Sequence, residues 1–175
     1  MKSFALASLC AATAFSKAMV GTNIGGWQVL EPWITPSLFY RFLGKGEGEV
    51  GMAQYSFCEA LGAEEGNRVL RAHWDAWITE DIIAGMAERE VEVARLPIGD
   101  WTLKEYGPYV GCTTGAAEKI DWFMDMAEKY NIKVLLDVHA VKDSQNGFDN
   151  SGQATITEWI TEDHFSHWEH AWAGW

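Results

Sequence analysis

A dense run of hydrogen-bonding side chains follows an apolar segment near residue 137 of this 175-residue chain. The segment, Val134-Leu135-Leu136, has the composition of a strand buried on both faces. The polar residues that come next are Asp137, His139, Asp143, Ser144, Gln145, Asn146, Asp149, Asn150 and Ser151. So many donors and acceptors are difficult to bury in a core. At the mouth of a strand they could bind a ligand that is rich in hydroxyl groups.

Two earlier runs mix apolar, aromatic and charged residues in a similar way. Residues 23–39, NIGGWQVLEPWITPSLF, surround Glu31 with aromatic side chains. Residues 93–101, VARLPIGDW, place Arg95 inside a short apolar segment.

Apolar periodicity predicts strands and helices that alternate around these runs. Strands are expected at residues 23–29, at 91–98 and from 132 onward, and helices at 64–78, 80–88, 115–130 and 163–172. Thr79 is the expected N-cap of the second helix, and Pro32 and Pro36 are expected to keep their segment out of regular helix. The alternation is typical of βαβ units with a parallel sheet, in one domain.

Taken in this order along the chain, the three runs closely resemble the exo-β-1,3-glucanases of glycoside hydrolase family five. The resemblance is strong from about residue 21 to about residue 152. It implies an α/β fold, the (β/α)8 or TIM barrel. It also implies an enzyme that releases glucose from the non-reducing ends of β-1,3-glucan with retention of configuration. Such a barrel takes about 250 residues, so residues 19–175 are expected to form its N-terminal portion, an incomplete barrel of about three β/α units.

The resemblance also assigns roles to individual residues. Arg95 and His139, near the ends of two expected strands, would support the catalytic carboxylates at the mouth of the barrel. Glu31, Asp149 and Asn150 would hydrogen-bond the terminal glucose. Structural roles remain open for the same residues: an ion pair for Arg95, a buried core position for His139, and loop capping for Asp149 and Asn150.

Neither catalytic glutamate of the family can be assigned to this sequence. Retaining hydrolysis needs two carboxyl groups about 5 Å apart, and the family supplies the first within an Asn-Glu pair, which does not occur in this chain. Glu158, Glu162 and Glu169 come too early and in a different setting. The chain is therefore expected to be inactive alone. Two alternatives are a non-catalytic β-glucan-binding protein and a non-functional truncated fragment.

Residues 1–18 have the features of a signal peptide, which predicts an extracellular, secreted protein. Lys2 supplies a short positive region, residues 4–15 are mostly apolar, and Ser16-Lys17-Ala18 has the small-x-small form of a cleavage site. A buried N-terminal helix is the alternative. A formal net charge of −12 argues against nucleic acid or membrane partners and suits a neutral β-glucan polysaccharide or oligosaccharide.

The sequence predicts no cofactor and no metal site. Cys58 and Cys112 would remain after cleavage of the signal, either as a disulfide or as two buried thiols. His164, His167 and His170 recur every third residue. On a helix such spacing turns by about 60° per step, so three ligands would not converge on one ion.

Six of the ten tryptophans fall into two groups. Those in or beside the polar motifs, where a flat ring could stack on a sugar, are Trp27, Trp33 and Trp101. Those on expected helices, and so assigned to the core, are Trp74, Trp77 and Trp122.

Overall fold

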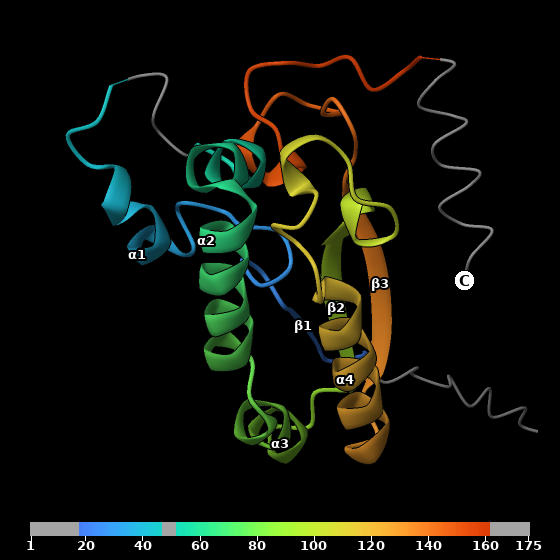
Figure 1. The fold of residues 1–175 in the computed structure, drawn as a ribbon. Helices are drawn as coiled ribbons and strands as arrows, with labels where there is room; N and C mark the ends of the chain where they lie inside the picture. Colours follow the sequence, from blue (N-terminus) through green and yellow to red (C-terminus); the bar gives the residue numbers. More distant parts are fainter. Residues whose placement is uncertain (1–17, 47–51, 162–175) are drawn as a thin grey trace, which may run out of the picture.

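Three parallel strands form one sheet in the computed structural model, which describes residues 18–46 and 52–161 (Figure 1). The strands are β1 (Gly21–Asn23), β2 (Val93–Gly99) and β3 (Lys133–Ala140), in the order β1-β2-β3. The crossover between β1 and β2 contains helices α1 (Pro36–Phe39), α2 (Gln54–Trp77) and α3 (Glu80–Glu88), and the crossover to β3 contains α4 (Ala116–Lys129). This is the predicted α/β arrangement of βαβ units.

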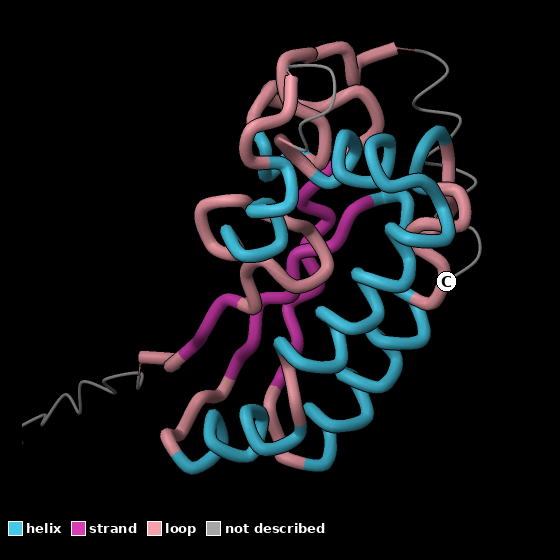
Figure 2. Tube along the Cα trace, turned by 60° about the vertical axis from the view of Figure 1, so that its left-hand side comes forward, coloured by secondary structure: helices cyan, strands magenta, loops and turns pink. Residues whose placement is uncertain are grey.

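The long helices cover one face of the sheet. In Figure 2 they lie along one side of the strands. Ala94, Leu96 and Ile98 of β2 point to that side and are fully buried, and α4 covers them with the predicted stripe that includes Ile120 and Phe123. None of the described helices is long and apolar enough to cross a bilayer.

The opposite face of the sheet carries the polar side chains. Side chains alternate between the two faces of a strand, so Arg95 of β2 and Asp137 of β3 point away from the helices. Leu135 lies on this face and is 56% exposed. The expectation that its strand is buried on both faces is therefore wrong for the described part of the chain, where helices pack on one face alone.

Several element boundaries differ from those predicted. The first strand ends at Asn23 rather than near residue 29, because Gly26 adopts φ = +67° and turns the backbone. The helix expected at 64–78 starts at Gln54 and contains a kink at Gly62. Pro36 begins α1 instead of preventing it, because proline fits the first turn of a helix.

The predicted N-cap of α3 is confirmed, whereas the last predicted helix falls outside the described part of the chain. Thr79 is the N-cap of α3, since its hydroxyl accepts from the Ile82 N–H at 3.4 Å. The helix expected at 163–172, with its three histidines, lies outside the described residues.

A disulfide joins Cys58 to Cys112 and resolves the choice that the sequence left open. It connects α2 to the segment that precedes α4, across 54 residues of sequence. Both cysteines are buried, and a Cβ placed on Gly66 would lie 2.6 Å from the Cys112 sulfur. The bond therefore fixes α2 against the second βα unit in a tightly packed region.

Replacing both cysteines, as Cys58→Ala with Cys112→Ala, is expected to lower the free energy of unfolding by about 2–4 kcal/mol, because the unfolded chain regains the freedom of a long loop. Urea unfolding of the oxidised wild type and the double variant measures this difference. Equal midpoints, with the bond verified in the wild type by mass spectrometry, would contradict a stabilising role.

Candidate functional site

Arg95 joins all three strands of the sheet through its side chain. It is paired in register with Asn23 of β1 on one side and with Leu135 of β3 on the other. Its Nη1 donates to Asn23 Oδ1 at 2.7 Å, and its Nη2 donates to the carboxylate of Asp137. Charge-assisted bonds of this kind are shorter and stronger than neutral ones. The guanidinium is therefore held in one position above the polar face of the sheet.

His139 extends this network toward the carboxyl end of β3. Its Nδ1 lies 2.9 Å from Asp137 Oδ2 and 2.9 Å from Arg95 Nη2. Arginine can only donate, so Nδ1 accepts the hydrogen bond from Arg95, and Nε2 carries the hydrogen and can donate to a ligand. The β2–β3 register is irregular at this point: Ile98 pairs with Val138 and Gly99 with Ala140. His139 thus has no partner on β2, and such irregularities commonly direct a side chain at a site.

Glu31 lies within electrostatic reach of this network although it comes from the loop after β1. It is 6% exposed. Burial raises the pKa of its carboxyl group, a backbone hydrogen bond from Gly26 and the charges of His139 and Arg95 lower it, and the charge of Asp149 raises it. Three of the other four predicted site residues, Arg95, His139 and Asp149, thus lie within electrostatic range of Glu31.

A sharp turn at Gly25-Gly26 positions Glu31, and side chains of helix α2 form hydrogen bonds to the backbone of that turn. His73 Nε2 lies 2.8 Å from the Gly26 carbonyl oxygen, and Trp77 Nε1 donates to the Gly25 carbonyl at 3.1 Å. A carbonyl can only accept, so Nε2 of His73 carries the hydrogen. Burial lowers the pKa of His73 and favours its neutral form. A Cβ on Gly26 would lie 2.8 Å from Ile34, so glycine is needed at this position.

Asp149 and Asn150 lie on the loop that follows β3, in a short 3-10 turn, Asp149–Ser151. Asn150 Oδ1 accepts from Asn146 Nδ2 at 3.2 Å, a bond within the loop of the kind that capping requires. Asp149 lies within electrostatic range of Glu31, and its charge raises the pKa of the Glu31 carboxyl group. Asp149 is thus near enough to act on Glu31 through its charge, while the Asn150 amide oxygen already accepts a hydrogen bond within the loop.

Asp100 ties together the loops that follow β2 and β3. Its Oδ2 accepts from the Lys142 backbone N–H at 2.8 Å, and its Oδ1 accepts from the Tyr106 hydroxyl at 2.8 Å. Burial raises the pKa of Asp100 to about 6, although both hydrogen bonds oppose that shift. The carboxyl group therefore joins the two loops next to the cluster.

Asp137 and Asn23 complete the cluster but were given no role from the sequence. Both belong to the polar motifs, and Asp137 lies two residues before His139, a spacing that places them on one face of a strand. This two-residue spacing is the sequence signal from which a role for Asp137 could have been predicted. Arg95 was expected near the end of its strand but lies in the middle of β2. Its side chain is long enough to carry the guanidinium to Asp137 and His139.

Two of the three tryptophans that were predicted to stack on a sugar are buried. Trp27 and Trp101 are 0% and 1% exposed, so their rings cannot reach a ligand. Trp27 donates to the Trp74 carbonyl at 3.1 Å, and Trp101 stacks on Tyr109 with ring centroids 4.1 Å apart. Trp33 is 72% exposed and remains a candidate. Among the helical tryptophans Trp77 is partly exposed rather than core.

The described residues contain no group of three or more histidine, cysteine, aspartate or glutamate side chains arranged to hold a metal ion. The cluster instead combines fixed donors, from Arg95 and His139, with acceptors from Glu31 and Asp149. Such a set can bind a neutral molecule that offers both hydroxyl hydrogens and hydroxyl oxygens.

The fold resembles that of solved glycosidases. The chain superposes on the crystal structure of rutinosidase from Aspergillus niger with a TM-score of 0.75 at 20% identity, covering 87% of this chain and 42% of that one. It superposes on the crystal structure of AoRut with a TM-score of 0.73 at 22% identity, covering 87% and 41%. At these identities the likeness concerns the fold alone.

Curated relatives give a more specific result. The chain is 43% identical over 141 residues to the glucan 1,3-beta-glucosidase of Pichia angusta, covering 79% of this chain and 31% of that protein. It is 41% identical over 155 residues to that of Yarrowia lipolytica, covering 87% and 36%. It is 38% identical over 157 residues to the sporulation-specific glucan 1,3-beta-glucosidase of Saccharomyces cerevisiae, covering 87% and 35%.

The chain thus spans about a third of the length of these curated relatives. Over most of its own length it is related to proteins named as glucosidases, which supports the resemblance noted from the motifs. No protein-family model matches the chain.

The hydrogen bond from His73 to the Gly26 carbonyl is expected to stabilise the fold. His73→Leu should lower the free energy of unfolding by about 1–3 kcal/mol, because a buried carbonyl loses its donor. His73→Gln should lose less, since its amide nitrogen can occupy the place of Nε2. Chemical unfolding of the three proteins measures the difference, and equal losses in the two variants would contradict the hydrogen bond.

Asp100 is expected to make stability depend on pH. Its pKa is about 6 in the fold and 3.8 in an unperturbed aspartate. The folded state therefore binds this proton more tightly. The resulting contribution, about 3 kcal/mol, is complete below pH 4 and is lost as the pH rises through 6.

The matched variant Asp100→Asn lacks this titration. The stability of the wild type relative to the variant should therefore fall between pH 4 and pH 7, as measured by urea unfolding at each pH. Parallel curves for the two proteins would show that Asp100 titrates normally.

Proposed function

We propose that this chain provides the glucose-binding part of a secreted glycoside hydrolase of family five that acts on β-1,3-glucan. The hydrolase would release glucose from the non-reducing ends of the polymer by a retaining mechanism. One observation carries the proposal: Glu31, Arg95 and His139 converge in a chain that is 38–43% identical to relatives named glucan 1,3-beta-glucosidase.

The chemistry of the cluster is suited to a terminal glucose. The Glu31 carboxylate would accept hydrogen bonds from two neighbouring hydroxyl groups, which would replace the water that burial has removed from it. Asp149 would accept another, and His139 Nε2 would interact with a further hydroxyl group. A binding site built from groups that are already fixed loses little entropy when its ligand arrives.

Arg95 would act by positioning. Because its guanidinium is held by Asn23 and Asp137, it supplies a fixed positive charge beside the bound sugar. Such a charge would keep a neighbouring catalytic carboxylate ionised. The acid/base and the nucleophile, about 5 Å apart in a retaining enzyme, are not assigned to residues of this chain. In this proposal they belong to the part of the relatives that the chain does not span.

The proposal predicts binding without turnover for the 175-residue chain. Laminari-oligosaccharides should change the tryptophan fluorescence in a saturable manner, while an assay for released glucose should stay at background. Glu31→Ala should weaken binding by about tenfold or more, the effect of one charge-assisted hydrogen bond. Arg95→Ala should weaken it as well, because Asp137 and His139 lose the group that positions them.

Glu88→Ala provides the control, because Glu88 is exposed at the end of α3 and has no part in the cluster. It should bind as the wild type does. A flat titration of folded wild type would refute the sugar-binding proposal. Release of glucose by the purified chain would refute the assignment of the reactive carboxyl groups to another segment.

A further inference from the structure

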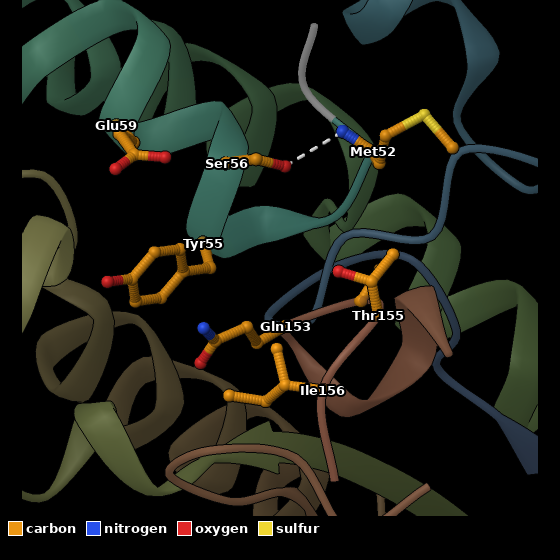
Figure 3. A pocket seen from close by; sticks show the side chains of 8 residues that line it. Met52, Tyr55, Ser56, Glu59, Gln153, Thr155 and Ile156 are labelled. Atoms are coloured by element: carbon orange, nitrogen blue, oxygen red, sulfur yellow. Dashed lines mark hydrogen bonds between the residues drawn. The ribbon is translucent and has the colours of Figure 1, made fainter. Parts of the chain in front are cut away.

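A pocket of about 300 Å³ lies between the start of α2 and the loop that follows β3. Figure 3 shows Tyr55, Ser56 and Glu59 on the helical wall, facing residues of the loop. The remaining lining residues are Met52, Gln153, Ala154, Thr155 and Ile156. None of the residues assigned to the Glu31 cluster lines this pocket, so it is a separate feature of the surface.

The aromatic wall of the pocket is rigid. The Tyr55 backbone N–H donates to the Gly152 carbonyl at 2.8 Å, which attaches the loop to the helix. The Tyr55 ring packs edge-on against Tyr109, with ring centroids 5.7 Å apart. Tyr109 in turn donates to the same Gly152 carbonyl at 3.0 Å. An aromatic ring that is held in this way can bind a ligand at low entropic cost.

Hydrogen bonds within the loop after β3 hold the other wall of the pocket in place. The hydroxyl oxygens of Ser144 and Ser151 lie 2.5 Å apart, and Ser144 Oγ also accepts from the Gly147 N–H at 2.7 Å. The Thr155 N–H donates to the Gly147 carbonyl at 2.9 Å. None of these bonds uses the side chains of Gln153 and Thr155, which make no hydrogen bond to another described residue. Both can therefore interact with a ligand.

Thr155 has an unfavourable backbone conformation. Its φ is +73°, a region that a β-branched residue rarely adopts. Strain of this kind persists where the surrounding structure imposes it, and it is often found at ligand sites. Glycine would be the natural residue at this position if the backbone alone mattered. Threonine adds a hydroxyl group, which lies at the pocket.

The charges near the pocket limit the class of ligand. Glu59 lies on its rim, and burial together with Glu59 and Asp143 raises the pKa of Tyr55, so the surroundings are negative. An anion would be repelled, as by the chain as a whole, whose formal net charge is −12. The lining instead combines an aromatic ring and apolar side chains with a carboxylate, an amide and a hydroxyl. This combination is suited to the apolar face and the hydroxyl groups of a sugar.

We infer that this pocket is a second binding site for neutral sugar units of a β-glucan chain, independent of the cluster around Glu31. The inference rests on the proposed function for the choice of sugar. The same loop, residues 143–158, carries Asp149 toward Glu31 and Gln153 and Thr155 toward the pocket. One braced segment would thus serve both sites, and a polymer could contact the protein at two places.

The experiment is an NMR titration of the full chain with laminaritriose, followed through the Met52 methyl and the Tyr55 and Ile156 signals. These signals should shift in a saturable manner, and they should still shift in Glu31→Ala. In Thr155→Gly the affinity at the pocket should fall about fivefold, the loss expected for one hydrogen bond. The unfolding temperature of that variant should not fall, since glycine tolerates the backbone conformation. Thr155→Ser keeps the hydroxyl group and should bind as the wild type does.

The possible outcomes separate the two proposals. Pocket signals that do not move at concentrations that saturate the Glu31 cluster would overturn the second site and leave the proposed function intact. Pocket shifts that vanish in Glu31→Ala would also overturn it, because the two sites would not be independent. A response to calcium but not to laminaritriose would identify Glu59 as a cation ligand and refute the sugar class. Pocket shifts without any change around Glu31 would instead count against the proposed function.

Discussion

The ion pair between Arg95 and Asp137 is the interaction on which the rest of the site depends. It spans β2 and β3, and the bond from Arg95 to Asn23 extends it to β1, so one guanidinium fixes the polar face of the whole sheet. Partly exposed ion pairs add little stability by themselves. The importance of this pair is therefore one of position: it fixes where the positive charge and the His139 ring lie.

Groups outside the sheet are brought to this network by hydrogen bonds to backbone atoms. His73 and Trp77 hold the carbonyl groups of the turn that presents Glu31. Asp100 accepts from the backbone after β3, and Gly152 accepts from the start of α2. Each contact joins segments that are distant in sequence. The loops at this end of the sheet are thus fixed before any ligand is present, as a preorganised site requires.

The sequence was informative where a period or a local signal was strong. Apolar spacing located α3 and α4, and Thr79 marked the start of α3, because those patterns depend on neighbouring residues. Prediction from the sequence failed where burial depends on contacts between segments that are distant in the chain. The burial of Trp101 follows from its stacking on Tyr109, and the exposure of Leu135 depends on which layers surround the sheet. The role of Asp137 appears once Arg95 and His139 are placed on either side of it.

The most direct test of this account is the titration of the Glu31 carboxyl group, followed by carbon-13 NMR in the wild type, Arg95→Gln and Asp149→Asn. Glu31 should titrate above its ordinary value of 4.5 in the wild type, because it is buried. Loss of the Arg95 charge should raise this pKa further, and loss of the Asp149 charge should lower it. A Glu31 that titrates at its ordinary value, and that responds to neither substitution, would mean that these groups do not form one site.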